Sequence, residues 1–208
     1  MAFSRENSPR PDPRSVFLNV PFDRRYSPLF LTAIVALTAL GRKPRCVLEV
    51  PSAGSSRLER IFELISGCEA SIHDLSRAGL SGSLRLPRFN MPFELGLACS
   101  LSLRGQHQFF VFEEKPFRLQ ATLSDLNGHD PHIHGGTQLG MLRCTLDCFG
   151  APSASPPINE LRRLVPRFSE AMRRLQAEYG VDSPFHPSLF RRAVDAAGKL
   201  AQIEGWVE

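Results

Sequence analysis

Short apolar runs alternate along the first half of the chain with segments whose apolar residues recur at helical spacing. The runs rich in β-branched and aromatic residues predict strands at 15–20, 45–50, 69–75 and 107–113. The segments of helical period predict helices at 27–41, 56–67 and 91–104. Strand and helix alternate with short connections, which is typical of a parallel sheet. The pattern therefore predicts an α/β domain, a Rossmann/flavodoxin-like parallel sheet with helices on both faces.

The second half of the chain is less regular. We expect a helix at 117–128, a loop at 128–136 and a fifth strand at 140–149. Two amphipathic patterns then predict C-terminal helices at 158–180 and 188–203, with a kink at Pro166. The expected organisation is a disordered lead at 1–14, the α/β domain at 15–150, and a linker with a C-terminal helical extension at 151–208.

Composition narrows the class of protein. The chain has 208 residues and a net charge of +4, without any run of five or six basic residues, so a nucleic-acid partner is not indicated and an anionic small ligand fits as well. Its five cysteines form no CxxC pair, which favours reduced, buried thiols. No apolar stretch approaches ~18 residues free of charge, so we expect no membrane association and a cytoplasmic location.

Two carboxylates stand where a parallel sheet places its ligands. Asp74 ends the third predicted strand, and Glu94 lies near the start of the next helix, close to the crevice beyond the carboxyl ends of the strands. A pair of carboxylates can cleave a glycosidic bond, one at the sugar carbon and the other managing the proton of the leaving group. Alternatively Glu94, as the third residue of a helix that Met91 caps, only binds free backbone N–H groups there.

Three segments together carry a resemblance to a known family. "FLNVPF", "SIHDLSR" and "FNMPFELGLA" resemble the nucleoside 2-deoxyribosyltransferase-like superfamily, and in particular an uncharacterised bacterial branch of it, distantly similar to the TIR domains that hydrolyse NAD. The resemblance covers residues 16–113, and most of its specificity lies in "FELGLA". It implies that Glu94 is the nucleophile and that Asp74 handles the base, without a cofactor. It also implies a homo-oligomer, for which the first C-terminal helix offers the apolar residues Leu161, Leu164, Val165, Phe168 and Met172.

One departure from the family pattern changes the expected ligand. Deoxyribosyltransferases carry an aspartate six residues before the nucleophile, and this chain has Arg88 there. An arginine cannot accept a hydrogen bond from a sugar hydroxyl, but it binds phosphate in a fork. Arg77 and the pair Arg24 and Arg25 flank the same rim, so a nucleotide or dinucleotide is the expected substrate. Each of these arginines also has an ordinary interpretation as a solvated surface charge.

Other polar residues are candidates for contacts with the substrate. Those expected at the crevice are Asn19, Phe22, Asp23 and Asn90, with Asp125 as a sugar-hydroxyl acceptor and Asp130 and His134 on a lid formed by the 128–136 loop. The histidines of this loop are crowded into one segment without the spacing of zinc ligands, so we expect no metal. Tyr26 stacks on a base or fills the core, and His73, which faces away from Asp74 on an alternating strand, is expected in the core.

Three functions remain open on the sequence. The first is an N-glycosidase or glycosyltransferase that acts on a nucleotide through Glu94. The second is a TIR-like NAD hydrolase that serves as an effector in bacterial defence. The third is a non-catalytic module that binds a nucleotide or a partner, in which Glu94 only caps a helix.

Overall fold

The computed structural model describes residues 11–49, 56–79, 87–126, 128–151 and 155–207. These contain one sheet of five parallel strands in the order β2-β1-β3-β4-β5. The strands are β1 (Asp12–Asn19), β2 (Lys43–Arg45), β3 (Cys68–Asp74), β4 (Gln108–Glu113) and β5 (His132–Ile133). The helices are α1 (Ser27–Ala39), α2 (Arg57–Ser66), α3 (Asn90–Ser102), α4 (Arg118–Thr122), α5 (Gln138–Phe149), α6 (Ile158–Glu178) and α7 (Pro187–Ile203). The predicted α/β, flavodoxin-like fold is confirmed.

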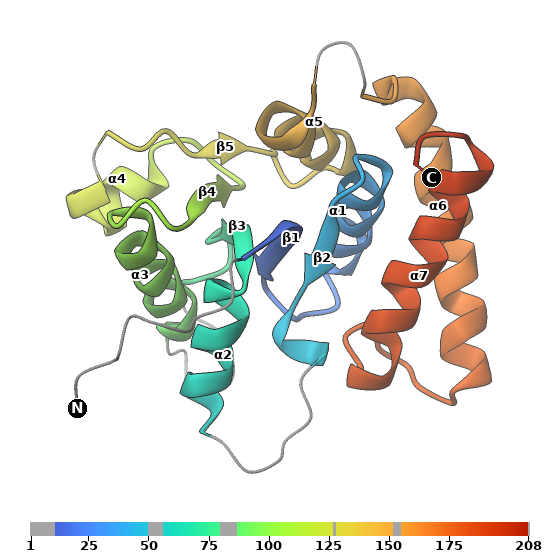
Figure 1. Cartoon of the computed structure of the whole chain (residues 1–208), viewed down its shortest axis with the longest axis horizontal. Coiled ribbons are helices and arrows are strands. Elements are labelled where there is room, and N and C mark those ends of the chain that lie inside the picture. Colours follow the sequence, from blue (N-terminus) through green and yellow to red (C-terminus); the bar gives the residue numbers. More distant parts are fainter. Residues whose placement is uncertain (1–10, 50–55, 80–86, 127, 152–154, 208) are drawn as a thin grey trace.

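Helices cover both faces of the sheet (Figure 1). On one face, Val16, Leu18 and Ile72 pack in a single apolar cluster with residues of α1, α5, α6 and α7. On the other face, Phe17 packs against α2 and α3. Successive strand residues point to opposite faces, so Phe17 and Leu18 belong to different layers.

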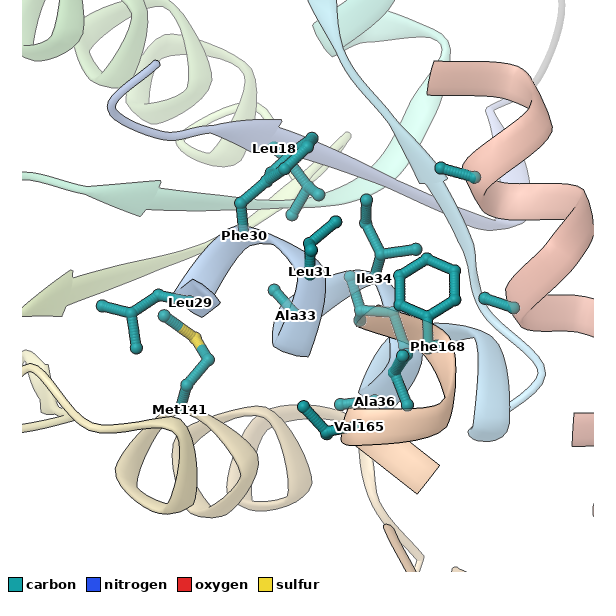
Figure 2. Packing of buried hydrophobic residues seen from close by; sticks show 14 of the residues in the cluster. Leu18, Leu29, Phe30, Leu31, Ala33, Ile34, Ala36, Met141, Val165 and Phe168 are labelled. Carbon is teal, nitrogen blue, oxygen red and sulfur yellow. The ribbon is translucent and has the colours of Figure 1, made fainter. Parts of the chain in front are cut away.

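Helix α1 is buried around its whole circumference. Every residue from Leu29 to Ala39 is buried, because the sheet lies on one side of the helix and α5, α6 and α7 lie on the other. Figure 2 shows Met141 of α5 and Phe168 of α6 closing over this helix from the side away from the strands. A helix with this environment has no polar face. Its buried residues are apolar except Thr32 and Thr38, whose hydroxyls donate to backbone oxygens of the same helix.

The expected intermolecular surface on the first C-terminal helix is wrong. Leu161, Leu164, Val165, Phe168 and Met172 are all buried within the chain, against α1 and α7. A helix whose apolar stripe is already covered has nothing left to offer a second subunit at that face. The homo-oligomer itself stays a prediction.

Two predicted strands need correction. The second strand is only Lys43–Arg45, and 47–49 form a 3-10 turn, since the Glu49 carboxylate accepts from the Cys46 backbone N–H at 3.0 Å and from the Arg45 side chain. Residues 140–149, expected as a strand, belong to helix α5, whose start is capped by the Thr137 side chain. The parallel fifth strand is instead the short β5, inside the expected loop.

Some boundaries also move. β1 begins at Asp12, so the expected disordered lead at 1–14 is too long; residues 1–10 lie outside the described part of the chain. The expected helix at 117–128 is shorter, with α4 at Arg118–Thr122 followed by a 3-10 turn at Ser124–Leu126. None of the described helices combines the length and hydrophobicity that crossing a bilayer requires.

Candidate functional site

A pocket of about 260 Å³ lies beyond the carboxyl end of β1. In sheets with the order 2-1-3-4-5, the gap between the ends of β1 and β3 is the switch point where ligands bind. The chain brings three elements there: the turn after β1, the start of α2 and the start of α3. The lining residues are Leu18, Asn19, Val20, Pro21, Phe22, Val47, Arg57, Arg88, Asn90, Met91 and Glu94.

Glu94 is the acid of this pocket. Helix α3 begins at Asn90, so Glu94 is its fifth residue rather than the third, and the helix start has no side-chain cap. The residue is only 5% exposed, and within the described part of the chain no donor hydrogen-bonds its carboxylate. The helix-capping interpretation is therefore wrong.

Burial changes the acidity of Glu94. Loss of hydration raises the pKa of its carboxyl group to about 7, although the positive charge of Arg57 acts in the opposite direction. A carboxyl group with a pKa near neutrality is present in both protonation states at pH 7. Such a pKa is expected of a residue that acts as a general acid, a general base or a nucleophile.

Asp74 does not share the pocket with Glu94. It is fully buried and accepts hydrogen bonds from Tyr26 and Ser76, and its Oδ2 lies 3.0 Å from Nε2 of His134. These partners come from the α1 and α5 side of the sheet, whereas the neighbouring His73 points to the α3 side. The structure thus places the two carboxylates on opposite faces, and Asp74 has the contacts of a structural residue.

A second buried acid adjoins Asp74, and the sequence reading missed it. Glu113 ends β4 and is 1% exposed; its Oε2 lies 3.6 Å from Nη1 of Arg118 and has no hydrogen-bond partner among the described atoms. Burial raises the pKa of Glu113, the Arg118 charge lowers it, and the Asp74 charge raises it. The signal in the sequence was the same as for Asp74: an acid at the carboxyl end of a predicted strand.

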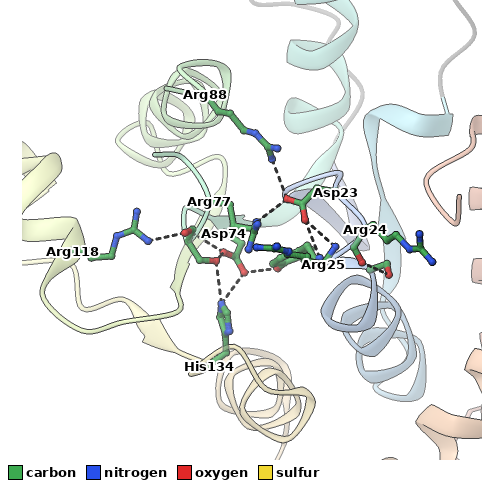
Figure 3. A network of polar contacts seen from close by, with 11 residues as sticks. Asp23, Arg24, Arg25, Asp74, Arg77, Arg88, Arg118 and His134 are labelled. Carbon is green, nitrogen blue, oxygen red and sulfur yellow. Dashed lines mark hydrogen bonds and ion pairs between the residues drawn. The ribbon is translucent and has the colours of Figure 1, made fainter. Parts of the chain in front are cut away.

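The arginines of the rim are paired with Asp23. Arg77 Nε lies 2.8 Å and Arg88 Nη1 3.4 Å from Asp23 Oδ2. Figure 3 shows both guanidinium groups directed at this carboxylate, and His134 directed at Asp74. Arg88 lines the pocket as predicted, while Arg77 does not. Arg24 and Arg25, exposed beside Asp23, are also outside the lining.

The remaining candidates divide between pocket and surface. Asn19, Phe22 and Asn90 line the pocket; Phe22 is 37% exposed, and the Phe185 ring lies 5.4 Å from its own. Asp125 and Asp130 are exposed and line none of the described hollows, so the expected hydroxyl acceptor and lid contact are not brought to this site.

Three further residues bear on the earlier expectations. His134 is buried and held by Asp74 on one nitrogen and by the Gly136 N–H on the other, so it is no lid contact. Tyr26 is buried against Asp74 and cannot stack on a base, whereas His73 lies in the core as expected.

Two more hollows flank the fold. One of about 210 Å³ shares Phe22, Val47 and Arg57 with the Glu94 pocket and extends it between α2 and Pro187 at the start of α7. Another of about 360 Å³ lies beside β5 and α5 and shares no lining residue with the Glu94 pocket. The Glu94 pocket and the 210 Å³ hollow therefore adjoin one another, and together they form the candidate site.

In the part of the chain that the structure describes, no group of three or more His, Cys, Asp or Glu side chains is suited to a metal ion.

Comparison with family models, with curated proteins and with solved structures found no match. The functional assignment therefore rests on the residues of the pocket.

Proposed function

We propose that the protein cleaves the N-glycosidic bond of a nucleotide-type substrate, with the Glu94 carboxylate as nucleophile. The observation that supports this proposal is a buried carboxylate that receives no hydrogen bond from the described residues, in a pocket at the switch point of the sheet. A carboxylate that has lost much of its hydration in such a place costs stability, and this cost is expected where a residue serves chemistry.

The reaction follows from this position. One oxygen of ionised Glu94 attacks the anomeric carbon, the bond from that carbon to the base nitrogen breaks, and the electron pair stays on the base. Water or an acceptor hydroxyl then attacks the same carbon, releases the Glu94 carboxylate and gives up its proton to the departing base or to solvent. Arg88 and Arg57, both at the pocket, offer positive charge to a phosphate on the substrate.

One observation favours NAD as a second candidate substrate. Glu94 is the one acid among the described residues that line the pocket, so a separate carboxylic acid to protonate the leaving base is not provided there. A base bound through a positively charged nitrogen, as nicotinamide is in NAD, leaves as a neutral molecule and needs no such acid. The adjoining 210 Å³ hollow offers space for the second half of a dinucleotide.

The experiment is incubation of the purified protein with a panel of nucleoside monophosphates, deoxynucleotides, the matching nucleosides and NAD, with free base measured by chromatography. We expect release of a base from at least one phosphorylated substrate, and faster than from its nucleoside. Glu94→Gln is the control for contaminating hydrolases. Absence of release from the whole panel, or equal release by the variant, would refute the proposal and favour a binding module.

A further inference from the structure

A chain of buried polar side chains crosses the core and ends at the Glu94 pocket. It starts at His107, just before β4, and continues through Ser71 and His73 of β3 to Asn19 of β1. The links measure 2.7 Å from His107 Nε2 to Ser71 Oγ, 2.8 Å from Ser71 Oγ to His73 Nε2, and 3.0 Å from His73 Nδ1 to Asn19 Nδ2. All four residues are at most 8% exposed.

At the His107 end, a backbone carbonyl fixes which atom donates in each of these hydrogen bonds. His107 Nδ1 lies 2.9 Å from the oxygen of Cys68, which can only accept, so Nδ1 carries the proton. In the neutral ring Nε2 is then an acceptor, and the Ser71 hydroxyl donates to it. The Ser71 oxygen in turn accepts from the Nε2–H of His73, which leaves His73 Nδ1 as an acceptor.

At the pocket end, a second backbone carbonyl independently fixes the orientation of the Asn19 amide. Asn19 Nδ2 donates to the backbone oxygen of Met91 at 2.9 Å, which identifies this atom as the amide nitrogen. Its other hydrogen points to His73 Nδ1, the acceptor required by the first argument. Burial lowers the pKa of His73 to about 3, and burial also lowers the pKa of His107 below its ordinary value. Both rings therefore stay neutral near pH 7, and the directions of the hydrogen bonds persist.

Both hydrogens of the Asn19 amide are thereby used inside the protein. Its oxygen, Oδ1, accepts from no donor in the part of the chain that the structure describes, and Asn19 lines the pocket that contains Glu94. The pocket thus presents an acceptor whose orientation cannot reverse without breaking two hydrogen bonds. An amide oxygen held in one orientation can accept a hydrogen bond from a hydroxyl group of a ligand.

We propose that Asn19 Oδ1 accepts a hydrogen bond from a hydroxyl of the substrate's sugar, and that His73, Ser71 and His107 are positioning residues that make the site selective for that hydroxyl. This inference rests on the proposed function only in that the sugar must lie beside Glu94. A buried acceptor that is left unpaired penalises ligands without the hydroxyl, which is how such sites discriminate.

The test uses three sugar phosphates that need no base: ribose 5-phosphate, 2-deoxyribose 5-phosphate and 3-deoxyribose 5-phosphate. Their affinities for the wild-type chain are measured by NMR titration. We expect ribose 5-phosphate to bind about ten-fold or more tightly than at least one deoxy sugar. Equal affinity for all three, including no measurable binding of any, overturns the proposal.

Variants separate recognition from stability. Asn19→Ala should make the three affinities equal. Ser71→Ala, which leaves Asn19 in place, should reduce the selectivity, because His73 Nδ1 is then no longer held as an acceptor and the Asn19 amide keeps only its bond to Met91. Ser15→Ala is the matched control: Ser15 is a fully buried serine of the neighbouring strand that bonds Asp12 and lies outside the chain of hydrogen bonds. It should keep the selectivity. Retained selectivity in Asn19→Ala would also overturn the proposal.

These outcomes are distinct from those of the proposed function. Selective sugar binding without base release from any substrate would refute the glycosidase and leave the role of Asn19 standing. Base release without selectivity for a hydroxyl would support the glycosidase and refute the role of Asn19.

Discussion

Replacing Glu94 by glutamine separates the chemistry of this residue from its effect on stability. Glutamine has nearly the same size and imitates the protonated, neutral form of the carboxyl group. The folded protein holds the pKa of Glu94 at about 7, whereas the ordinary value is 4.5. Ionisation of Glu94 at pH 8 therefore costs the folded state about 3 kcal/mol, because each pH unit between the two values corresponds to about 1.4 kcal/mol.

The sign of the pH dependence follows directly. Between pH 4.5 and 7 the folded state keeps a proton that the unfolded chain has released, so the free energy of unfolding decreases as pH rises through this window. The variant has no group to titrate there. Its advantage in stability over the wild type should grow from near zero at the acidic end to about 3 kcal/mol at pH 8, measured by urea unfolding at several pH values.

Turnover of the wild type should increase as pH rises, whereas its stability decreases. Base release by the wild type should increase about ten-fold per pH unit below pH 7 and level off above it, because only the carboxylate is nucleophilic. Above pH 7, Glu94→Gln should be slower than the wild type by about three orders of magnitude or more. The variant would then be more stable and inactive, a combination that a structural acid does not produce.

Glu63→Gln is the control, since Glu63 is an exposed acid of α2 and its substitution changes the net charge equally. It gives the effect of losing one surface charge, with which the pH dependence of the Glu94→Gln difference is compared. If the Glu94→Gln difference does not vary with pH in this window, the carboxylate is not desolvated in solution. If Glu94→Gln retains turnover, Glu94 is not the nucleophile.

Three other substitutions test the remaining assignments. Asp74→Asn should lower the free energy of unfolding by about 2–4 kcal/mol, measured with urea, because it removes a buried charge with several donors. The kcat of the folded fraction should stay within about ten-fold of the wild type. A complete loss of kcat would show that Asp74 takes part in catalysis. Arg88→Ala should weaken binding of a nucleotide about ten-fold more than binding of its nucleoside, with the exposed Arg104→Ala as control, and an equal effect on both ligands would show that Arg88 does not read phosphate. Phe168→Ala should cost about 3–5 kcal/mol, since its ring is wholly buried against α1; a change below 1 kcal/mol would mean that α6 does not pack there. Light scattering on the wild type checks the predicted homo-oligomer, which a mass of one chain would contradict.

The fold could be predicted from the sequence because strand and helix periods alternate clearly up to residue 113. The fifth strand could not. Residues 140–149 are a short apolar run in which Met141, Leu142, Cys144 and Thr145 are buried on one side of a helix, a spacing too brief to distinguish from a strand.

The site was predicted in part for an equally physical reason. Asp74 and Glu94 follow one another in a strand–helix unit, which suggests that they meet. Whether they do depends on which face of the sheet α3 covers, and the sequence does not state this. His73, not Asp74, points toward α3, so the residue one place earlier on the strand faces the pocket side. The orientation of Asn19 likewise required the positions of two distant carbonyl oxygens.

The burial of α1 has a consequence for how the protein is made. Helix α1 lies near the beginning of the chain, but the residues that cover its outer side come from α5, α6 and α7, the last of which ends at Ile203. During synthesis, which adds about 5–20 residues per second, the apolar surface of α1 therefore stays uncovered until the residues up to Ile203 have been added. We expect nascent chains that end before α7 to bind chaperones and to be sensitive to proteases, and folding to be completed only once the C-terminal helices have left the ribosome.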